Sequence, residues 1–173
     1  MMKKAQVKKD LRQSTNNLLE VLSAAPADIF NTRPDKDEWP IGKVAEHLIK
    51  VETGTVRIFT GPAEATVRDP EEKIENIRDR MLDHETKMRA YGPIIPDDKL
   101  KDKTKVLEKI QDIRQQMSSF IDIQDLTETV TGFDHPIFGP LTRIEWIYFN
   151  IYHSRRHSHK IEEINNLISR QSE

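Results

Sequence analysis

Three histidines have the spacing of a metal site. His153 and His157 lie four residues apart in the segment I-E-W-I-Y-F-N-I-Y-H-S-R-R-H-S-H-K-I, which spans 144–161. In a helix, residues four apart differ by about 40° around the axis and about 6 Å along it, so both side chains share one face. His47 lies on a second apolar stripe, within 44–59. Three imidazoles from two helices can bind one divalent ion and leave a fourth position for water or substrate.

The H-x-x-x-H pair is predicted to face the protein interior. Residues at steps of three and four form one stripe along its helix: Trp146, Asn150, His153, His157, Ile161 and Ile164. Asn150 lies one turn before His153, so it is a candidate to support a ligand or contact substrate, with ordinary core packing as the equal alternative. No residue is identified as a catalytic acid or base, and none as a ligand of an organic cofactor.

A purely structural interpretation of the histidines is equally compatible with their spacing. Each one alone is better explained as a hydrogen-bonded core residue, and H-x-x-x-H also arises by chance. No glutamate follows the first histidine as in H-E-x-x-H, so the metalloprotease mechanism does not carry over. The other polar residues near these segments are predicted at the surface: His84, His135, His159, Glu46 and Glu52. For His135, a position at the open end of the bundle is the alternative. Arg155 and Arg156 either bind an anionic group or form surface ion pairs.

Length and composition favour one cytoplasmic domain, 1–173. A chain of this length buries a sizeable core, and the absence of cysteine excludes disulfides and thiolate chemistry. Twenty-seven basic and 29 acidic residues give a formal charge of −2, without the basic excess of nucleic-acid-binding proteins. No apolar run approaches the roughly 18 residues of a membrane span, and no signal peptide follows the basic amino terminus. We therefore expect neither a nucleic-acid nor a membrane partner.

Five helical segments are expected to position these residues. Apolar residues recur at helical spacing over 3–24, 41–60, 100–121 and 141–169, with Thr142 as the cap of the last segment. A more polar helix of about twenty residues should begin at D-P-E-E, capped by Asp69, and lie against the bundle as a crossover. The segment 126–140 is expected to cover one end of the bundle as an extended loop. The fold class is therefore all-α, a four-helix bundle with an additional crossover helix.

Two segments resemble the DinB-like superfamily, which includes metal-dependent hydrolases of the YfiT type and thiol S-transferases. They are W-P-I-G-K-V-A-E-H-L-I, from Trp39, and H-P-I-F-G-P-L-T-R-I-E-W-I-Y-F-N-I-Y-H-S-R-R-H-S-H-K-I, from His135. The similarity extends over nearly the whole chain. It implies a four-helix bundle with one metal ion, held by a histidine of the second helix and the H-x-x-x-H pair of the last. Here those ligands are His47, His153 and His157.

The resemblance implies a metal-dependent enzyme, either a hydrolase or a thiol S-transferase. Its mononuclear site would activate water or a small thiol for attack on a small-molecule substrate, and the thiol would come from outside the chain. Zinc or nickel is the expected ion, with iron or manganese as alternatives. The competing hypothesis is a non-catalytic bundle that binds metal or acts through interaction. A homodimer is compatible with the sequence, although no specific patch predicts it.

Overall fold

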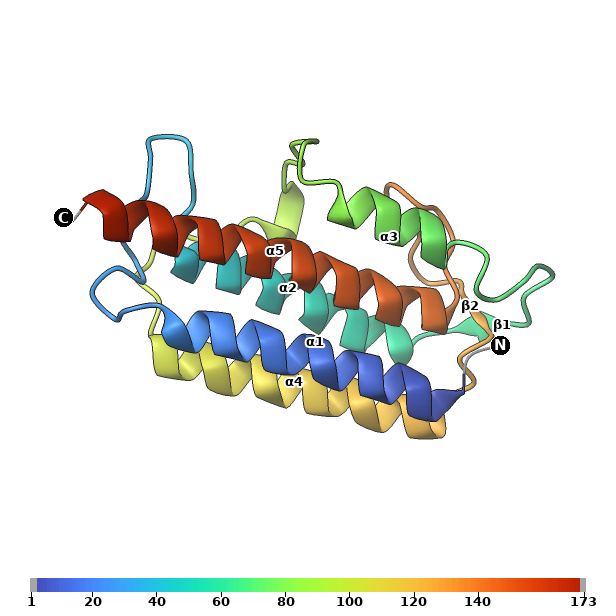
Figure 1. The fold of residues 1–173 in the computed structure, drawn as a ribbon. Helices are drawn as coiled ribbons and strands as arrows, with labels where there is room; N and C mark the ends of the chain where they lie inside the picture. The colour runs from blue at the N-terminus through green and yellow to red at the C-terminus, as the bar shows by residue number, and fades with distance from the viewer. Residues whose placement is uncertain (1–2, 172–173) are drawn as a thin grey trace.

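Four long helices form the frame of the protein (Figure 1). The computed structural model describes residues 3–171. The frame consists of α1 Lys4–Ala24, α2 Ile41–Phe59, α4 Lys103–Ile123 and α5 Arg143–Gln171. Helices α1 and α2 each pack against both α4 and α5. In the four-cornered bundle α1 therefore lies diagonally opposite α2, and α4 lies diagonally opposite α5. The structure confirms the predicted all-α four-helix bundle.

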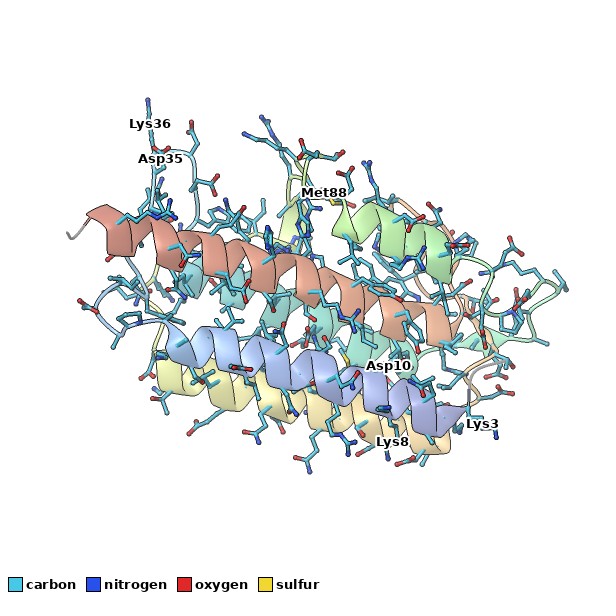
Figure 2. The ribbon with its side chains drawn as sticks, in the orientation of Figure 1. Lys3, Lys8, Asp10, Asp35, Lys36 and Met88 are labelled. Carbon is cyan, nitrogen blue, oxygen red and sulfur yellow. The ribbon has the colours of Figure 1, made fainter. Side chains whose placement is uncertain are left out.

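Apolar residues at steps of three, four and seven drive the association of the helices. The fully buried side chains come from all four of them and include Leu11, Leu18, Leu22, Ile41, Leu48, Ile110, Met117, Ile121, Ile147 and Ile161. Burial of one such side chain stabilises the fold by about 1.5–3 kcal/mol. Charged side chains such as Lys8 and Asp10 of α1 lie on outer faces (Figure 2). No helix within the described residues is long and apolar enough to cross a membrane.

The crossover helix, α3 Ile74–Leu82, packs along α5 (Figure 1). It buries Ile77 and Met81 against the bundle and leaves its polar residues outside. Because α1 and α2 also pack on α5, the first part of α5 is enclosed, and every residue from 141 to 151 is buried. This helix carries two of the three candidate ligands, so its position largely determines the site.

The crossover helix is shorter than expected, nine residues instead of about twenty. The predicted cap, Asp69, instead accepts the Glu71 N–H at 2.9 Å in a separate turn. At the other end, the Arg156 guanidinium of α5 donates to the carbonyl oxygens of Met81 and Thr86, at 3.2 and 2.6 Å, and also to that of Asp83. Carbonyl groups at and beyond the end of α3 thus accept hydrogen bonds from Arg156 instead of from the next helical turn. Tertiary contacts therefore end α3 at Leu82, although the local sequence would favour a longer helix.

The first turn of α5 is held by a buried carboxylate. Thr142 and Glu145 form the reciprocal contacts of a capping box, with Thr142 N–H to Glu145 Oε2 at 2.9 Å and Glu145 N–H to Thr142 Oγ1 at 3.3 Å. The predicted cap at Thr142 is therefore confirmed. Glu145 also pairs with both terminal nitrogens of Arg68, at 2.7 and 2.6 Å, and accepts the Lys73 N–H at 2.9 Å. The connection before α3 is thereby fastened to α5.

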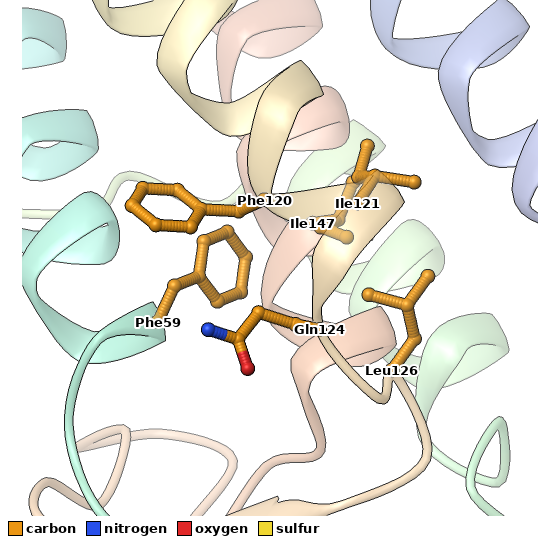
Figure 3. Close-up of a pocket in the computed structure, with 6 residues that line it drawn as sticks. All are labelled: Phe59, Phe120, Ile121, Gln124, Leu126 and Ile147. Atoms are coloured by element: carbon orange, nitrogen blue, oxygen red, sulfur yellow. The ribbon is translucent and has the colours of Figure 1, made fainter.

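A minimal antiparallel ribbon closes the same end of the molecule. Strand β1, Ala63–Glu64, pairs with β2, Thr129–Val130. An extended loop was expected there, and the pairing adds to it a sheet of two strands with two residues each. A small apolar pocket, too tight to hold a water molecule, lies nearby and is lined by Phe59, Phe120, Ile121, Gln124, Leu126 and Ile147 (Figure 3). Because these residues carry no titratable group, we assign the pocket no chemistry.

Sequence reasoning placed Glu52 at the surface, and this was wrong. Its side chain is 1 % exposed and forms an ion pair with Arg114 of α4, which is 3 % exposed. Arg114 Nε donates to Glu52 Oε2 at 2.7 Å, and its Nη1 lies 3.5 Å from Ser14 Oγ. Ser14 in turn bonds to Ser154 Oγ at 2.7 Å. The bundle thus contains a buried polar chain of residues that crosses all four long helices.

Candidate metal centre

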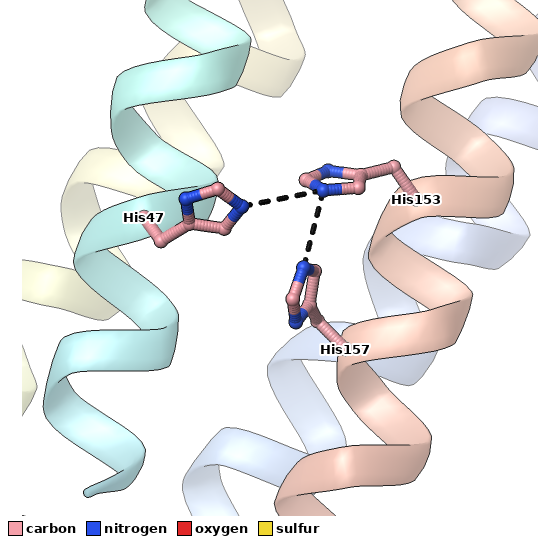
Figure 4. A group of neighbouring side chains, drawn as sticks. All are labelled: His47, His153 and His157. Carbon is pink, nitrogen blue, oxygen red and sulfur yellow. Dashed lines mark hydrogen bonds between the residues drawn. The ribbon is translucent and has the colours of Figure 1, made fainter. Parts of the chain in front are cut away.

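The three predicted ligands meet between two adjacent helices (Figure 4). His47 projects from α2, and His153 and His157 project from α5, one turn apart. Nε2 of His153 lies 3.3 Å from Nε2 of His47 and 3.1 Å from Nε2 of His157. Within the described residues they form the one group of at least three histidine or acidic side chains whose possible ligand atoms all lie within 4.8 Å of one another.

These separations fit a shared metal ion. Two nitrogens bound to one zinc ion at about 2.0–2.1 Å and a tetrahedral angle would lie about 3.3 Å apart. The two Nε2–Nε2 distances around His153, 3.3 and 3.1 Å, are close to this value. Neutral imidazole is also the ligand type that zinc and nickel accept readily. The residues present therefore fit a divalent ion.

A backbone carbonyl orients His47. Nδ1 of His47 lies 2.9 Å from the Ile94 carbonyl oxygen, in the short 3₁₀ helix η1, Gly92–Ile94. A carbonyl can only accept, so Nδ1 carries the proton and the lone pair of Nε2 points to the shared centre. This segment is fastened to α2, because Lys50 Nζ donates to the Ile95 carbonyl at 2.7 Å and Glu46 accepts the Asp97 N–H at 3.0 Å.

Burial keeps all three imidazoles neutral. It is the largest cause that lowers the pKa of His47 below 6.5; the Ile94 hydrogen bond opposes this effect and the Lys50 charge adds to it. The pKa of His153 lies well below 6.5, because of burial and then of the neighbouring His157 and His47. Burial, followed by the charges of His47 and Arg156, lowers the pKa of His157 to about 3. Neutral imidazole is the form that binds metal.

Aromatic rings enclose the cluster. Phe149 stacks on His153 with a centroid distance of 5.2 Å and an interplanar angle of 18°. The Trp39 ring lies 5.6 Å from that of His47. These contacts exclude water from two of the ligands and fix their ring planes, so less side-chain freedom remains to be lost when an ion binds.

The remaining sequence-predicted residues lie outside the cluster. His84 and His159 are exposed, as expected, with ring centroids 4.3 Å apart. His135, expected at the surface, is instead only 7 % exposed, because Trp146, Phe138 and Phe149 surround it. In the tight turn after it Phe138 is buried but Ile137 is 49 % exposed, so no periodic signal was present from which the position of His135 could be predicted.

Asn150 is buried between α2 and α5. Its amide nitrogen donates to Thr55 Oγ1 at 2.9 Å and to the Trp146 carbonyl at 2.7 Å. The bond to Thr55 joins the two ligand-bearing helices at a point one turn from His153, whereas the bond to Trp146 lies within α5. Support of a ligand or contact with substrate, as the sequence suggested for Asn150, stays a prediction.

Fold and site together define a class of protein: a helical bundle with a buried three-histidine cluster. Residues 10–161 match the DinB superfamily, and the chain belongs to this family. It is 27 % identical over 163 residues to the uncharacterised protein YuaE of Bacillus subtilis (strain 168), covering 93 % of this chain and 96 % of YuaE.

Two solved structures share the fold. YfiT from Bacillus subtilis, described as a probable metal-dependent hydrolase with an unusual four-helix bundle topology, aligns with a TM-score of 0.61. That alignment has 14 % identity and covers 98 % of this chain and 90 % of YfiT. The four-helix bundle protein TT2238 aligns with a TM-score of 0.58 and 21 % identity, over 93 % of this chain and 99 % of its own.

Proposed function

We propose that this protein is a metal-dependent enzyme of the hydrolase or thiol S-transferase type, with one divalent ion held by His47, His153 and His157. The observation that carries the proposal is the convergence of three Nε2 atoms from two helices. The family membership and the description of YfiT support the same class. Zinc and nickel suit an all-imidazole site best, with iron and manganese as alternatives.

Each ligand residue has a defined task in this proposal. A bound divalent ion would lower the pKa of water or a thiol, or polarise a carbonyl group. The Ile94 carbonyl keeps the proton of His47 on Nδ1, so that Nε2 faces the shared centre. The charges of Lys50 and Arg156 act on the cluster and favour an anionic nucleophile or substrate there. A thiol nucleophile would have to come from a separate molecule, because the chain contains no cysteine.

A non-catalytic metal-binding bundle is the second candidate. It is favoured by the composition of the cluster, which in residues 3–171 contains three histidines and no carboxylate to act as a general base. A metal-bound water can still attack without such a base when its pKa is low enough, so we prefer the enzymatic function. The homodimer, the cytoplasmic location, the single domain and the absence of a nucleic-acid partner stay predictions.

Metal content tests the ligand assignment. Protein purified without a nickel column should contain about one equivalent of a divalent ion, and His153→Ala should lose most of it, because two ligands hold an ion far less tightly than three. His159→Ala is the matched control, since His159 lies on the same helix but is exposed. Circular dichroism checks that each variant is folded. A folded His153→Ala protein with the metal content of the unaltered protein would refute the assignment.

A substrate screen separates the two candidate functions. The metal-loaded protein is incubated with small esters, amides and electrophiles plus a low-molecular-weight thiol, and product formation is followed. Turnover that disappears with a chelator and returns with zinc supports the enzyme. A protein that binds the ion at the three histidines but turns over none of these substrates would favour the non-catalytic bundle.

A further inference from the structure

The backbone around His135 fixes its neutral ring in the tautomer that carries the proton on Nε2. Its Nδ1 accepts the backbone N–H groups of Ile137 at 3.1 Å and Phe138 at 3.3 Å. An Nδ1 that accepts two hydrogen bonds carries no proton, so the neutral ring carries its proton on Nε2. Among the described residues, this Nε2–H group has no hydrogen-bond partner. The turn therefore fixes His135 as a donor without an acceptor.

Two further nitrogens beside His135 also lack an acceptor and, unlike Nε2 of His135, are among the buried unpartnered atoms of the described residues. Trp146 Nε1 and His153 Nδ1 are buried and lack a hydrogen-bond partner within the described part of the chain. The indole N–H can only donate, and Nδ1 of His153 must carry the proton when Nε2 binds an ion. A buried donor without an acceptor destabilises a protein by about 1–3 kcal/mol. Within residues 3–171, Arg143 Nε and Ser158 Oγ are also buried without a partner, but Trp146 and His153 both pack against Phe149, and this indicates a place for acceptor atoms from outside the chain.

These nitrogens belong to rings that surround Phe149, next to the ligands. The centroid of Phe149 lies 4.5 Å from that of His135, 5.7 Å from Trp146 and 5.2 Å from His153. Phe149 precedes His153 by one helical turn, about 6 Å along α5. A charge on His135 would lower the pKa of His153, so the two rings are within electrostatic range. Phe149 thus contacts the two donor rings as well as the ring of His153.

We propose that His135 contacts substrate: its Nε2–H donates to a carbonyl or carboxylate oxygen of a molecule whose reacting end lies at the three-histidine cluster, and Trp146 Nε1–H is the second donor. This inference rests on the proposed function. It gives the substrate class as a small molecule that carries an acceptor oxygen at the end away from its reacting group.

Two substitutions separate the structural from the binding role of His135. His135→Asn keeps an acceptor where Nδ1 lies, so the turn is retained, but it removes the distal donor. His135→Gln keeps a donor near the Nε2 position and loses the acceptor that the turn uses. If His135 is purely structural, His135→Gln should destabilise the protein more than His135→Asn, and neither change should affect binding. A substrate contact predicts that Asn weakens binding while metal content stays unchanged.

Two hydroxamates of equal chain length serve as probes on the zinc-loaded protein. Both place a hydroxamate at the ion, but succinic acid monohydroxamate ends in a carboxylate and butanohydroxamic acid ends in a methyl group. Isothermal titration should show that the carboxylate probe binds roughly tenfold tighter, as expected for a hydrogen bond to a charged acceptor. His135→Asn should abolish this ratio and His135→Gln should retain most of it. Trp146→Phe, which keeps the ring packing, should reduce it.

The outcomes distinguish this inference from the proposed function. Equal binding of both probes, or a ratio that His135→Asn and Trp146→Phe leave unchanged, overturns the substrate contact while the metal centre stands. Absence of zinc-dependent binding for both probes counts against the metal centre and removes the inference with it. If His135→Asn does not fold, Trp146→Phe alone decides, because it removes a donor without touching the turn.

Discussion

The buried pair of Glu52 and Arg114 provides a sharp test of what stabilises this bundle. The change is Arg114→Met, which keeps the apolar stem of the side chain and removes the guanidinium group. It leaves the carboxylate of Glu52, which is 1 % exposed, in the interior without its partner. Removal of one partner from a buried pair typically lowers the free energy of unfolding by about 3–5 kcal/mol. For a protein of this size that corresponds to a fall in Tm of roughly 6–20 °C.

A double variant, in which both charged residues are replaced, completes the test. In Glu52→Leu/Arg114→Met the interior contains no unpaired charge, and replacement of a buried pair by apolar residues of similar volume is often neutral or stabilising. We therefore expect the double variant to recover most of the loss and to lie within about 2 kcal/mol of the unaltered protein. Its metal content should be normal, because neither residue belongs to the histidine cluster.

Urea denaturation of the metal-free proteins, followed by far-ultraviolet circular dichroism, gives the three free energies of unfolding. Ser14 must be kept unchanged throughout, because its hydroxyl lies 3.5 Å from Arg114 Nη1 and links the pair to α5. A single variant destabilised by less than about 1 kcal/mol, or a double variant no more stable than the single one, would refute the reasoning.

Two further predictions concern pH and the start of α5. The metal-free protein should lose stability as the pH falls below about 6.5, because the unfolded chain then binds protons that buried histidines exclude. His135, whose pKa burial lowers to about 4, alone contributes about 2 kcal/mol of loss between pH 6.5 and 4.5, so urea midpoints should fall and His135→Asn should show a flatter pH profile. Glu145→Ala should lower the free energy of unfolding by about 3 kcal/mol, because it removes a cap and the partner of Arg68 from a fully buried position, whereas the exposed Glu75→Ala should change it by less than about 0.5 kcal/mol. A Glu145→Ala melting curve that matches that of Glu75→Ala would contradict this.

The long helices and the inward orientation of the three histidines could be predicted from the sequence, because the spacing of apolar residues shows which face of a helix is buried. An apolar residue every three or four positions faces the core, so a histidine on the same stripe does too. This predicted that His47, His153 and His157 face the interior of the bundle, where the structure brings them together (Figure 4). The cap at Thr142 was predictable for a similar reason, since its partner Glu145 lies three residues away.

Residues whose environment depends on distant partners could not be placed in this way. Glu52 has the residue type of a surface acid, and its partner Arg114 is 62 positions away. The length of α3 depends on Arg156, 75 positions from Met81. The Ile94 carbonyl that orients His47 is backbone, and every residue has one, so no residue type could have identified it.

The buried polar groups of this protein show where a ligand should bind. Some of them are paired within the chain, such as Glu52 with Arg114 and Asn150 with Thr55. Beside the cluster, Trp146 and His153 each bury a nitrogen without a partner. Since each unpaired nitrogen costs free energy, an apolar residue would serve packing better at position 146. The paired groups therefore form their hydrogen bonds within the folded chain. The nitrogens around Phe149 form theirs only when a molecule with acceptor oxygens binds next to the three histidines.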